Sequence, residues 1–487
     1  MKRNIALLST LFLSACISSP TTTPQASKIP PESLGLSGEA APQFPDEWWK
    51  AFHDPQVDQL AELTLVHNPT LQSALDRIRS AQAELSAARA NDRPQVTLDG
   101  QEQRELFSKN YIIPPPFGGT WQWFGQIQAN LSWNIDFWGK QAAIIARARD
   151  NAQAAALDAA AARLALSGAL AQTYINLLLA YQESDIAAET VAEREEILKL
   201  TLGRFNAGLE DESAVEQAKA LVALARADQK RTTAQRELDV HAIAALTGQG
   251  ATAYPSITRP APNLDTALLL PTALPADLLA RRPDILAAEA RVEAAAKGRE
   301  AAHADFYPNI NLLAFAGFQA IGLSRLFTSD SFSYGAGPAI HLPIFDAGRI
   351  RANYAGATAD LDAAVEAYNG AVLDAVRQTA DAMTQVASLQ SQCADQQAAL
   401  DSATRSFSQA QTRYRTGLSD QIVMLNAEST LLTAREQMAT LLANSTIQRV
   451  TLLLSVGGGF NPINEAGEPA KSGAASQIDG KTASAKD

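Results

Sequence analysis

Hydrophobic and polar positions follow a helical period over most of the chain. Apolar residues recur at spacings of three and four, as at Leu71, Leu75 and Ile78, within stretches rich in Ala, Leu, Arg and Glu. These residue types lose little conformational freedom in a helix, so the pattern favours α-helix. We expect six helices, over residues 69–91, 140–204, 212–246, 276–305, 349–413 and 421–455.

Two of these helices are unusually long. Residues 140–204 and 349–413 contain no proline, and at 1.5 Å per residue each would form a rod of about 98 Å. Each rod is followed by a short turn and by a return helix of about half its length. The shorter helix of the same half of the chain could complete the return by stacking on it end to end.

A strictly alternating pattern replaces the helical period at residues 121–136. Such alternation is typical of a strand with one apolar and one polar face. A weaker alternation covers residues 332–345, where Pro338 interrupts it. We therefore expect two strand pairs, 95–106 with 121–136 and 309–319 with 332–345. The polar face of the clearest strand consists of Gln126, Gln128, Asn130, Ser132 and Asn134.

This order of elements occurs twice in the chain. Residues 68–98 align with residues 282–312, 214 positions later, and the run RFNAGL at 204–209 returns as RYRTGL at 413–418, 209 positions later. The second copy is therefore five residues shorter, within the region of the strand pair. A duplication of this length predicts two similar structural units. We place these units at residues 56–260 and 261–460.

Composition and charge narrow the class of protein. With 46% hydrophobic and 19% charged residues over 487 positions, most of the chain should fold. The net charge of −12 argues against a nucleic-acid partner, because phosphates require a basic surface. The sequence has no run of about 20 consecutive apolar residues, the length that a membrane-spanning helix needs. A membrane would therefore have to be crossed by strands.

Aromatic residues surround the clearest strand. Four of the six tryptophans lie within residues 121–138, and transmembrane barrels place aromatic side chains at both membrane interfaces. A soluble sandwich with an aromatic core is the alternative. Four strands cannot close a barrel, and an open sheet edge is not tolerated in hydrocarbon. In the membrane interpretation the chain must oligomerise, and three copies would supply twelve strands.

The first residues are expected to be a targeting segment. Lys2 and Arg3 precede a short apolar run at 5–13, and the run then ends in Leu13-Ser14-Ala15-Cys16. This ending resembles a bacterial lipoprotein signal, which implies cleavage before Cys16 and acylation of that cysteine. An ordinary secretory signal with an incidental cysteine is the alternative. We expect a signal peptide at 1–15, a lipid-anchored extended tether at 16–55 and a disordered tail at 461–487.

Three motifs point to a known family. They are Trp48-Trp49-x-x-Phe52-x-Asp54-Pro55, Arg281-Arg282-Pro283-Asp284 and the paired turns RFNAGL and RYRTGL. Together they resemble the TolC-like outer-membrane efflux lipoproteins, the channel partners of tripartite drug exporters. The resemblance implies a mainly α fold with a small transmembrane β part. In this fold three chains form a twelve-stranded β-barrel, four strands per chain, which a long periplasmic α-helical barrel continues.

The resemblance also implies a function and partners. The chain would be a homotrimeric channel of the outer membrane that carries small molecules from a periplasmic adaptor protein and an inner-membrane transporter to the outside. A type I secretion channel that exports protein is the alternative. No cofactor is expected beyond a covalent lipid on Cys16, and outer-membrane lipid surrounds the strands.

Candidate functional residues follow from this interpretation. The polar strand face would line the pore. Gly208 and Gly417 are expected to end the long helices in a left-handed conformation, and by resemblance these turns, with Leu209 and Leu418, contact the adaptor. Two acids follow the turns, Asp211 and Asp420. They could form a periplasmic gate, or they could cap the return helices. Family members carry gate acids at two later positions, where this chain has Val423 and Asn426.

An enzyme is not expected. The five histidines are scattered without metal-ligand spacing, and the sequence contains no HExxH, GxSxG, CxxC or phosphate-binding loop motif. We therefore predict neither a catalytic site nor a metal site.

Overall fold

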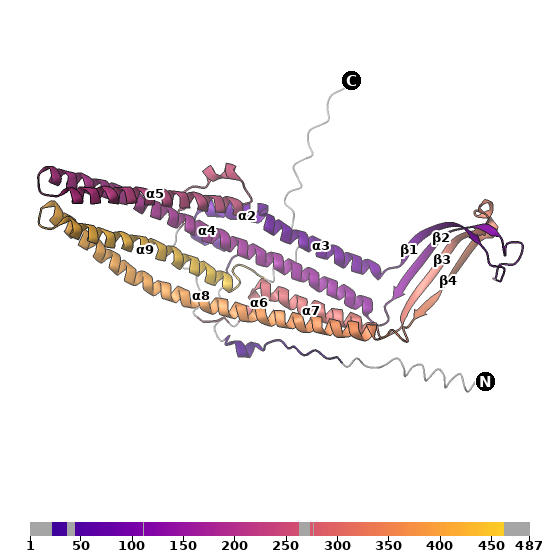
Figure 1. The fold of residues 1–487 in the computed structure, drawn as a ribbon. Coiled ribbons are helices and arrows are strands. Elements are labelled where there is room, and N and C mark those ends of the chain that lie inside the picture. The colour runs from indigo at the N-terminus through magenta and orange to yellow at the C-terminus, as the bar shows by residue number, and fades with distance from the viewer. Residues whose placement is uncertain (1–21, 37–43, 111, 263–272, 276, 462–487) are drawn as a thin grey trace, which may run out of the picture. The chain divides into compact units, whose positions relative to one another are not determined.

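The computed structural model describes residues 22–36, 44–110, 112–262, 273–275 and 277–461, and most of these residues are helical (Figure 1). The α-helices are α2 (Pro55–His67), α3 (Pro69–Asn91), α4 (Lys140–Asn206), α5 (Glu212–Leu246), α6 (Leu278–Arg281), α7 (Pro283–Ala304), α8 (Arg349–Arg415) and α9 (Gln421–Ser455). The strands are β1 (Gln95–Leu106), β2 (Trp121–Ile135), β3 (Asn309–Ile321) and β4 (Phe332–His341). Short 3₁₀ turns are η1 (Pro31–Leu34), η2 (Trp48–Phe52), η3 (Ala251–Ser256), η4 (Leu323–Arg325) and η5 (Ser329–Ser331). The expected mainly α class with four strands is confirmed.

Proline changes two of the expected elements. The helix expected at 276–305 is divided into α6 and α7, because Arg282 precedes Pro283 and adopts an extended conformation. The strand expected at 332–345 ends at His341. Pro343 has no amide hydrogen to continue the ladder.

The segment expected to be an extended tether folds before residue 55. Trp48, Trp49 and Phe52 of η2 are buried, and α2 begins at Pro55 with the carboxylate of Asp54 accepting from the amide of Gln56 at 3.0 Å. Residues 1–21 and 462–487 lie outside the described residues, and so do the signal segment, Cys16 and nearly all of the expected tail.

The chain forms two compact units. One consists of Met1–Ile29, Leu75–Leu157 and Ala287–Ala371 and contains the four strands, and the other consists of Pro30–Ala74, Asp158–Leu286 and Val372–Asp487. Each unit takes segments from both halves of the sequence. The compact units are therefore different divisions from the sequence repeats, whose boundaries stay a prediction.

The four strands form one antiparallel sheet in the order β1-β2-β3-β4 (Figure 1). Gln95 pairs with Ser132, and Asn134 pairs with Asn311. Pro338 lies within β4 opposite Leu312. Within the single chain β4 is an edge strand with β3 as its one neighbour.

The core of the second unit lies around the middle of α4. Leu170, Tyr174 and Leu177 of this helix pack in one cluster with Trp48 and Phe52, and the hydroxyl of Tyr174 donates to Asp54 at 2.5 Å. Burial of each large apolar side chain stabilises the fold by about 1.5–3 kcal/mol. By length and composition alone α4 is also apolar enough to cross a membrane. Within the most apolar stretch of this helix, 33% of the residues are buried.

The return helices α5 and α9 are each connected to a short helix, α3 and α7, by the same kind of hydrogen bond. The side chain of Asn68, which precedes α3, donates to the last carbonyl of α5, Leu246, at 2.8 Å. The side chain of Arg282, which precedes α7, donates to the last carbonyl of α9, Ser455, at 3.0 Å. Each return helix thus meets the beginning of a short helix, the arrangement expected from the helix lengths.

Candidate functional site

The polar positions of β2 lie on one face of the sheet and bond to one another. Gln126 donates to Gln128, Gln128 to Asn130 at 2.8 Å, and Asn130 to Asp99 of β1 at 2.7 Å. Ser132 bonds to Asn311 of β3 at 3.0 Å. The structure therefore joins Gln126, Gln128 and Asn130 in one hydrogen-bonded row, and Ser132 bonds separately to β3.

Strand β1 contributes a polar row that the sequence pattern did not reveal. By register its odd-numbered residues lie on the same face as the even-numbered residues of β2. The row consists of Gln95, Thr97, Asp99, Gln101, Gln103 and Glu105. The alternation is obscured because Glu102 and Arg104 occupy the opposite face near the end of the strand. The polar face consequently carries two carboxylates, Asp99 and Glu105, and His341 of β4 lies on it as well.

Apart from Glu102 and Arg104 near the end of β1, the opposite face of the sheet is apolar and exposed. Val96, Leu98 and Ile340 are 66%, 72% and 71% exposed. At the strand ends, the indole of Trp138 donates to the carbonyl of Pro308 at 2.8 Å, and that of Trp133 to the carbonyl of Asp92 at 3.0 Å. An exposed apolar surface bordered by indoles with satisfied N–H groups suits a lipid environment. A sandwich would need a second sheet, and the described residues form only one.

The long helices end in matching turns. Gly208 has φ of +75°, its amide donates to Phe205, and the amide of Leu209 donates to Arg204 at 2.9 Å. Gly417 has φ of +78° and makes the equivalent bonds after α8. These are the two hydrogen bonds of a Schellman ending, which requires the left-handed conformation that glycine adopts without strain. The expected role of both glycines in ending the helices is confirmed.

The two acids after these turns differ. The carboxylate of Asp211 accepts from the amide of Ala214 at 2.9 Å and so caps α5. Asp420 occupies the equivalent position before α9, but its side chain makes no capping hydrogen bond. Both are exposed. Capping is therefore confirmed for Asp211 only, and the suggested gate role stays a prediction for both residues.

Apolar side chains are exposed around both turns. Leu209 is 67% exposed and Leu418 is 77% exposed. On α9, Ile422 and Val423 are 59% and 50% exposed. The sequence predicted the two leucines as exposed contact residues but not Ile422, which lies in the first turn of α9.

Polar contacts that the sequence did not predict link α4 with α8 and α9 close to the turns. Tyr414 is fully buried, and the guanidinium of Arg204 lies 4.9 Å from the centre of its ring. The side chain of Gln421 donates to the hydroxyl of Thr201 at 3.0 Å. The repeat gave no signal for this burial, because Tyr414 aligns with Phe205, and Phe205 is 40% exposed. The two turns are therefore similar in backbone but not in packing.

A buried ion pair lies further along the same helices. The guanidinium Nε of Arg194 on α4 is 3.0 Å from the carboxylate of Glu428 on α9, with the side chains 9% and 2% exposed. Burial raises the pKa of Glu428 to about 7, although Arg194 opposes this shift and Glu193 adds to it. Glu428 lies on the same helix as the buried apolar side chains of Met424, Leu425 and Leu431, which we term the apolar seam of α9.

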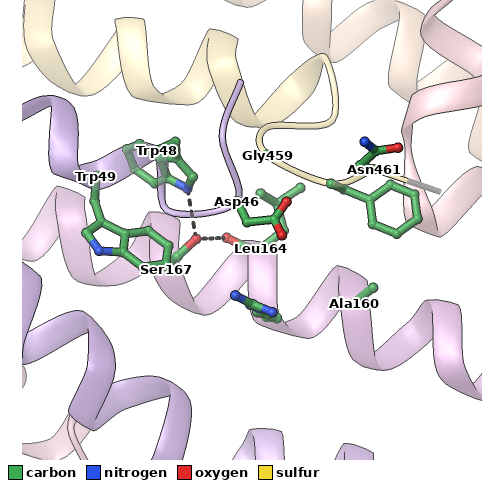
Figure 2. A pocket seen from close by; sticks show the side chains of 10 residues that line it. Asp46, Trp48, Trp49, Ala160, Leu164, Ser167, Gly459 and Asn461 are labelled. Carbon is green, nitrogen blue, oxygen red and sulfur yellow. Dashed lines mark hydrogen bonds between the residues drawn. The ribbon is translucent and has the colours of Figure 1, made fainter. Parts of the chain in front are cut away.

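A small cavity lies between η2, α4 and the end of the described chain (Figure 2). Its volume is about 50 Å³, and the indole of Trp48 donates there to Ser167 at 3.2 Å. This volume suits a few water molecules rather than a substrate. Among the residues that the structure describes, no group of three His, Cys, Asp or Glu side chains is arranged to hold a metal ion.

Comparisons with known proteins identify the family. The sequence model of the outer membrane efflux protein family matches residues 60–249 and 274–458. The fusaric acid resistance protein FusA of Burkholderia cepacia is 35% identical over 72% of this chain and 68% of its own length. The multidrug resistance outer membrane protein MdtP of Shigella flexneri is 30% identical over 93% of this chain and 95% of its own.

A solved structure agrees with these sequence matches. The outer membrane protein VceC of Vibrio cholerae is 32% identical and superimposes with a TM-score of 0.80 over 86% of this chain and all of its own. The fold, the exposed apolar face of the sheet and the sequence matches point the same way. This chain belongs to the outer membrane efflux protein family, whose TolC-like members are outer-membrane channels with a long helical periplasmic extension.

Proposed function

We propose that this chain is the outer-membrane component of a tripartite efflux pump and conducts small molecules such as drugs. The observation that carries this proposal is the sheet, which has a hydrogen-bonded polar face and an exposed apolar face. A polar face beside water and an apolar face beside lipid are what a pore wall requires. The names of the relatives, fusaric acid resistance and multidrug resistance, support small molecules as the cargo.

Three copies would close the pore. Among the described strands, β1 and β4 each have one neighbour, so each leaves an unpaired edge. Unpaired backbone groups in hydrocarbon cost several kcal/mol each. Twelve strands from three copies would close the barrel, with Gln126, Gln128, Asn130, Ser132 and Asn134 lining its lumen.

The turns at the helix ends would contact the periplasmic adaptor. Leu209 and Leu418 are exposed next to the rigid turns of Gly208 and Gly417, and exposed apolar side chains on a rigid support are typical of a protein contact. Asp211 and Asp420 would place six carboxylates near these ends in a trimer, where they favour cations. The channel makes no bond change in its cargo, so an inner-membrane transporter must supply the energy. A lipid on Cys16 would anchor the chain to the outer membrane.

Two measurements test the proposal together. The purified protein should form ion-conducting channels in planar lipid bilayers, and a strain that lacks the gene should become more sensitive to drugs. Absence of conductance would contradict any channel function. Conductance combined with lost protein secretion and unchanged drug sensitivity would instead identify a secretion channel.

A further inference from the structure

The described N-terminal segment is held against α8 through its backbone. The carboxylate of Asp362 accepts from the amides of Gln25 and Ala26 at 2.9 and 3.0 Å. The amide side chain of Asn369 accepts from the amide of Ile29 at 2.9 Å and donates to the carbonyl of Ser27 at 3.0 Å. Asn369 is only 7% exposed. A site that bonds backbone groups in both directions recognises an extended segment whatever its side chains are.

One side chain fixes the register of this segment. The ammonium of Lys28 bonds to Glu289 of α7 at 2.9 Å and lies 5.1 Å from the centre of the Tyr368 ring. Because the segment meets Asn369 at residue 29 and Asp362 at residue 25, it runs toward the start of α8 as the residue numbers decrease. Residues 25–29, which we term the strap, therefore lead toward the junction between β4 and α8.

The length of chain before the strap limits where its N-terminal end can lie. Nine residue steps separate Cys16 from Gln25, and an extended chain covers at most about 32 Å over that length. Thirteen helical steps separate Asp362 from Arg349, the first residue of α8, or about 20 Å. Cys16 can therefore reach no more than about 12 Å beyond the start of α8. Ile344 and Phe345, just before α8, are 86% and 89% exposed, as expected for side chains at a membrane interface.

We propose that Asp362, Asn369 and Glu289 form a docking site for the strap, and that the docked strap sets the height of the lipid on Cys16 relative to the junction between β4 and α8. This inference rests on the proposed lipid anchor. The site would act as a ruler: it holds the strands at the membrane that they must enter, and it moves the anchored end of the tether from Leu36, whose side chain packs against a buried apolar cluster, to Gln25.

The ruler is tested by changing the tether in the full-length protein. A ten-residue Gly-Ser insertion after Ser19 lengthens the tether from nine to nineteen residues. Effective concentration falls as the −3/2 power of tether length, so oligomer assembly in pulse-chase experiments should slow about threefold. Replacement of residues 19–24 by Gly and Ser at equal length is the matched control and should assemble at the wild-type rate.

Removal of the docking site should have a similar effect. In Asp362→Ala/Asn369→Ala the tether extends to Leu36, 20 residues from Cys16, and assembly should slow about threefold. Trypsin should also cleave after Lys28 at least about tenfold faster in this variant, because the strap is released. The exposed carboxylate of Asp360 lies on the same helix, and Asp360→Ala should change neither rate.

Mass spectrometry of the N-terminus separates the proposed lipid anchor from the proposed control of its height by the strap. An acylated protein whose assembly ignores the insertion would overturn the ruler and leave the lipid anchor standing. A protein without acylation would overturn both. In a Cys16→Ala background, neither the insertion nor the docking-site variant should slow assembly further.

Discussion

At the residue scale, Glu428 is the most unusual charge in the described chain. It lies in the apolar seam of α9 beside Arg194, where a second acid, Glu193, also has a pKa raised by burial. Arg435 faces the same region, 3.8 Å from Glu193 and 3.5 Å from Glu189. A buried ion pair is weak evidence for stability, because desolvation offsets the attraction.

The pH dependence of stability should reveal this residue. The pKa of Glu428 rises from 4.5 in a free side chain to about 7 in the fold. The folded state therefore binds the proton more tightly, and this group's contribution is full below pH 4.5 and lost as the pH rises through 7. The loss is at most roughly 3.5 kcal/mol, at about 1.4 kcal/mol per pKa unit.

Thermal unfolding followed by circular dichroism between pH 5 and pH 8 provides the measurement. Glu428→Gln should show a smaller decrease in unfolding temperature over this range than the wild type. Glu216→Gln, which changes an exposed glutamate on α5, should keep the wild-type slope. If Glu428→Gln also keeps that slope, the carboxyl of Glu428 does not titrate in this range.

The two acids after the turns allow charge to be separated from capping. Asn caps a helix as well as Asp does, whereas Ala costs about 1 kcal/mol. Asp211→Asn/Asp420→Asn should keep the unfolding temperature and reduce the cation preference of single channels. Asp211→Ala should lower stability more than Asp420→Ala, because only Asp211 makes the capping bond. Unchanged selectivity in the double Asn variant would leave capping as the role of Asp211.

At the element scale, the helix ends depend on two glycines. A residue with a β-carbon in the left-handed conformation costs about 1–2 kcal/mol, and a bulky one would also change the surface next to Leu209 and Leu418. Gly208→Val/Gly417→Val should abolish restoration of drug resistance in a deletion strain while oligomers persist on gels. Gly203→Ala provides the control, because Gly203 is helical and has open space around it. Loss of the oligomer itself would indicate a folding role.

Periodic elements could be predicted from the sequence, and contacts between elements could not. The helical period and the absence of proline located α4 and α8, and strict alternation located β2. The two errors in element boundaries both lie at prolines. Hydrophobicity alone would continue the helix through Pro283 and the strand through Pro343, but proline interrupts both. The polar row of β1 was missed because Glu102 and Arg104 break its alternation.

Single buried polar residues are the least visible in a sequence. Glu428 and Tyr414 look like surface residues of a helix, because only the packing of α4 against α8 and α9 buries them. The strap was likewise hidden in a Pro- and Ser-rich stretch, since its partners Asp362 and Asn369 lie more than 330 positions away.

At the scale of the whole molecule, the unpaired edges of the sheet predict how copies join. The strands alternate in direction from β1 to β4, so β4 of one copy would pair antiparallel with β1 of the next. An even number of antiparallel strands then closes without an edge. By register, Thr97 of β1 lies on the polar face, as do the odd-numbered residues of β4, whereas Leu98 lies on the apolar face.

Cysteine pairs across the two edges test this closure. In a Cys393→Ser background, Thr97→Cys should be combined in turn with Ser333→Cys, Gly335→Cys, Gly337→Cys and Ala339→Cys. At least one pair should oxidise to linked dimers and trimers, because a disulfide needs Cα atoms within about 7 Å and side chains on the same face. Leu98→Cys with the same partners should give none, since its side chain points to the opposite face. If every Thr97 pair stays monomeric while the protein conducts ions, β1 and β4 of neighbouring copies are not paired, and the pore is closed in another way.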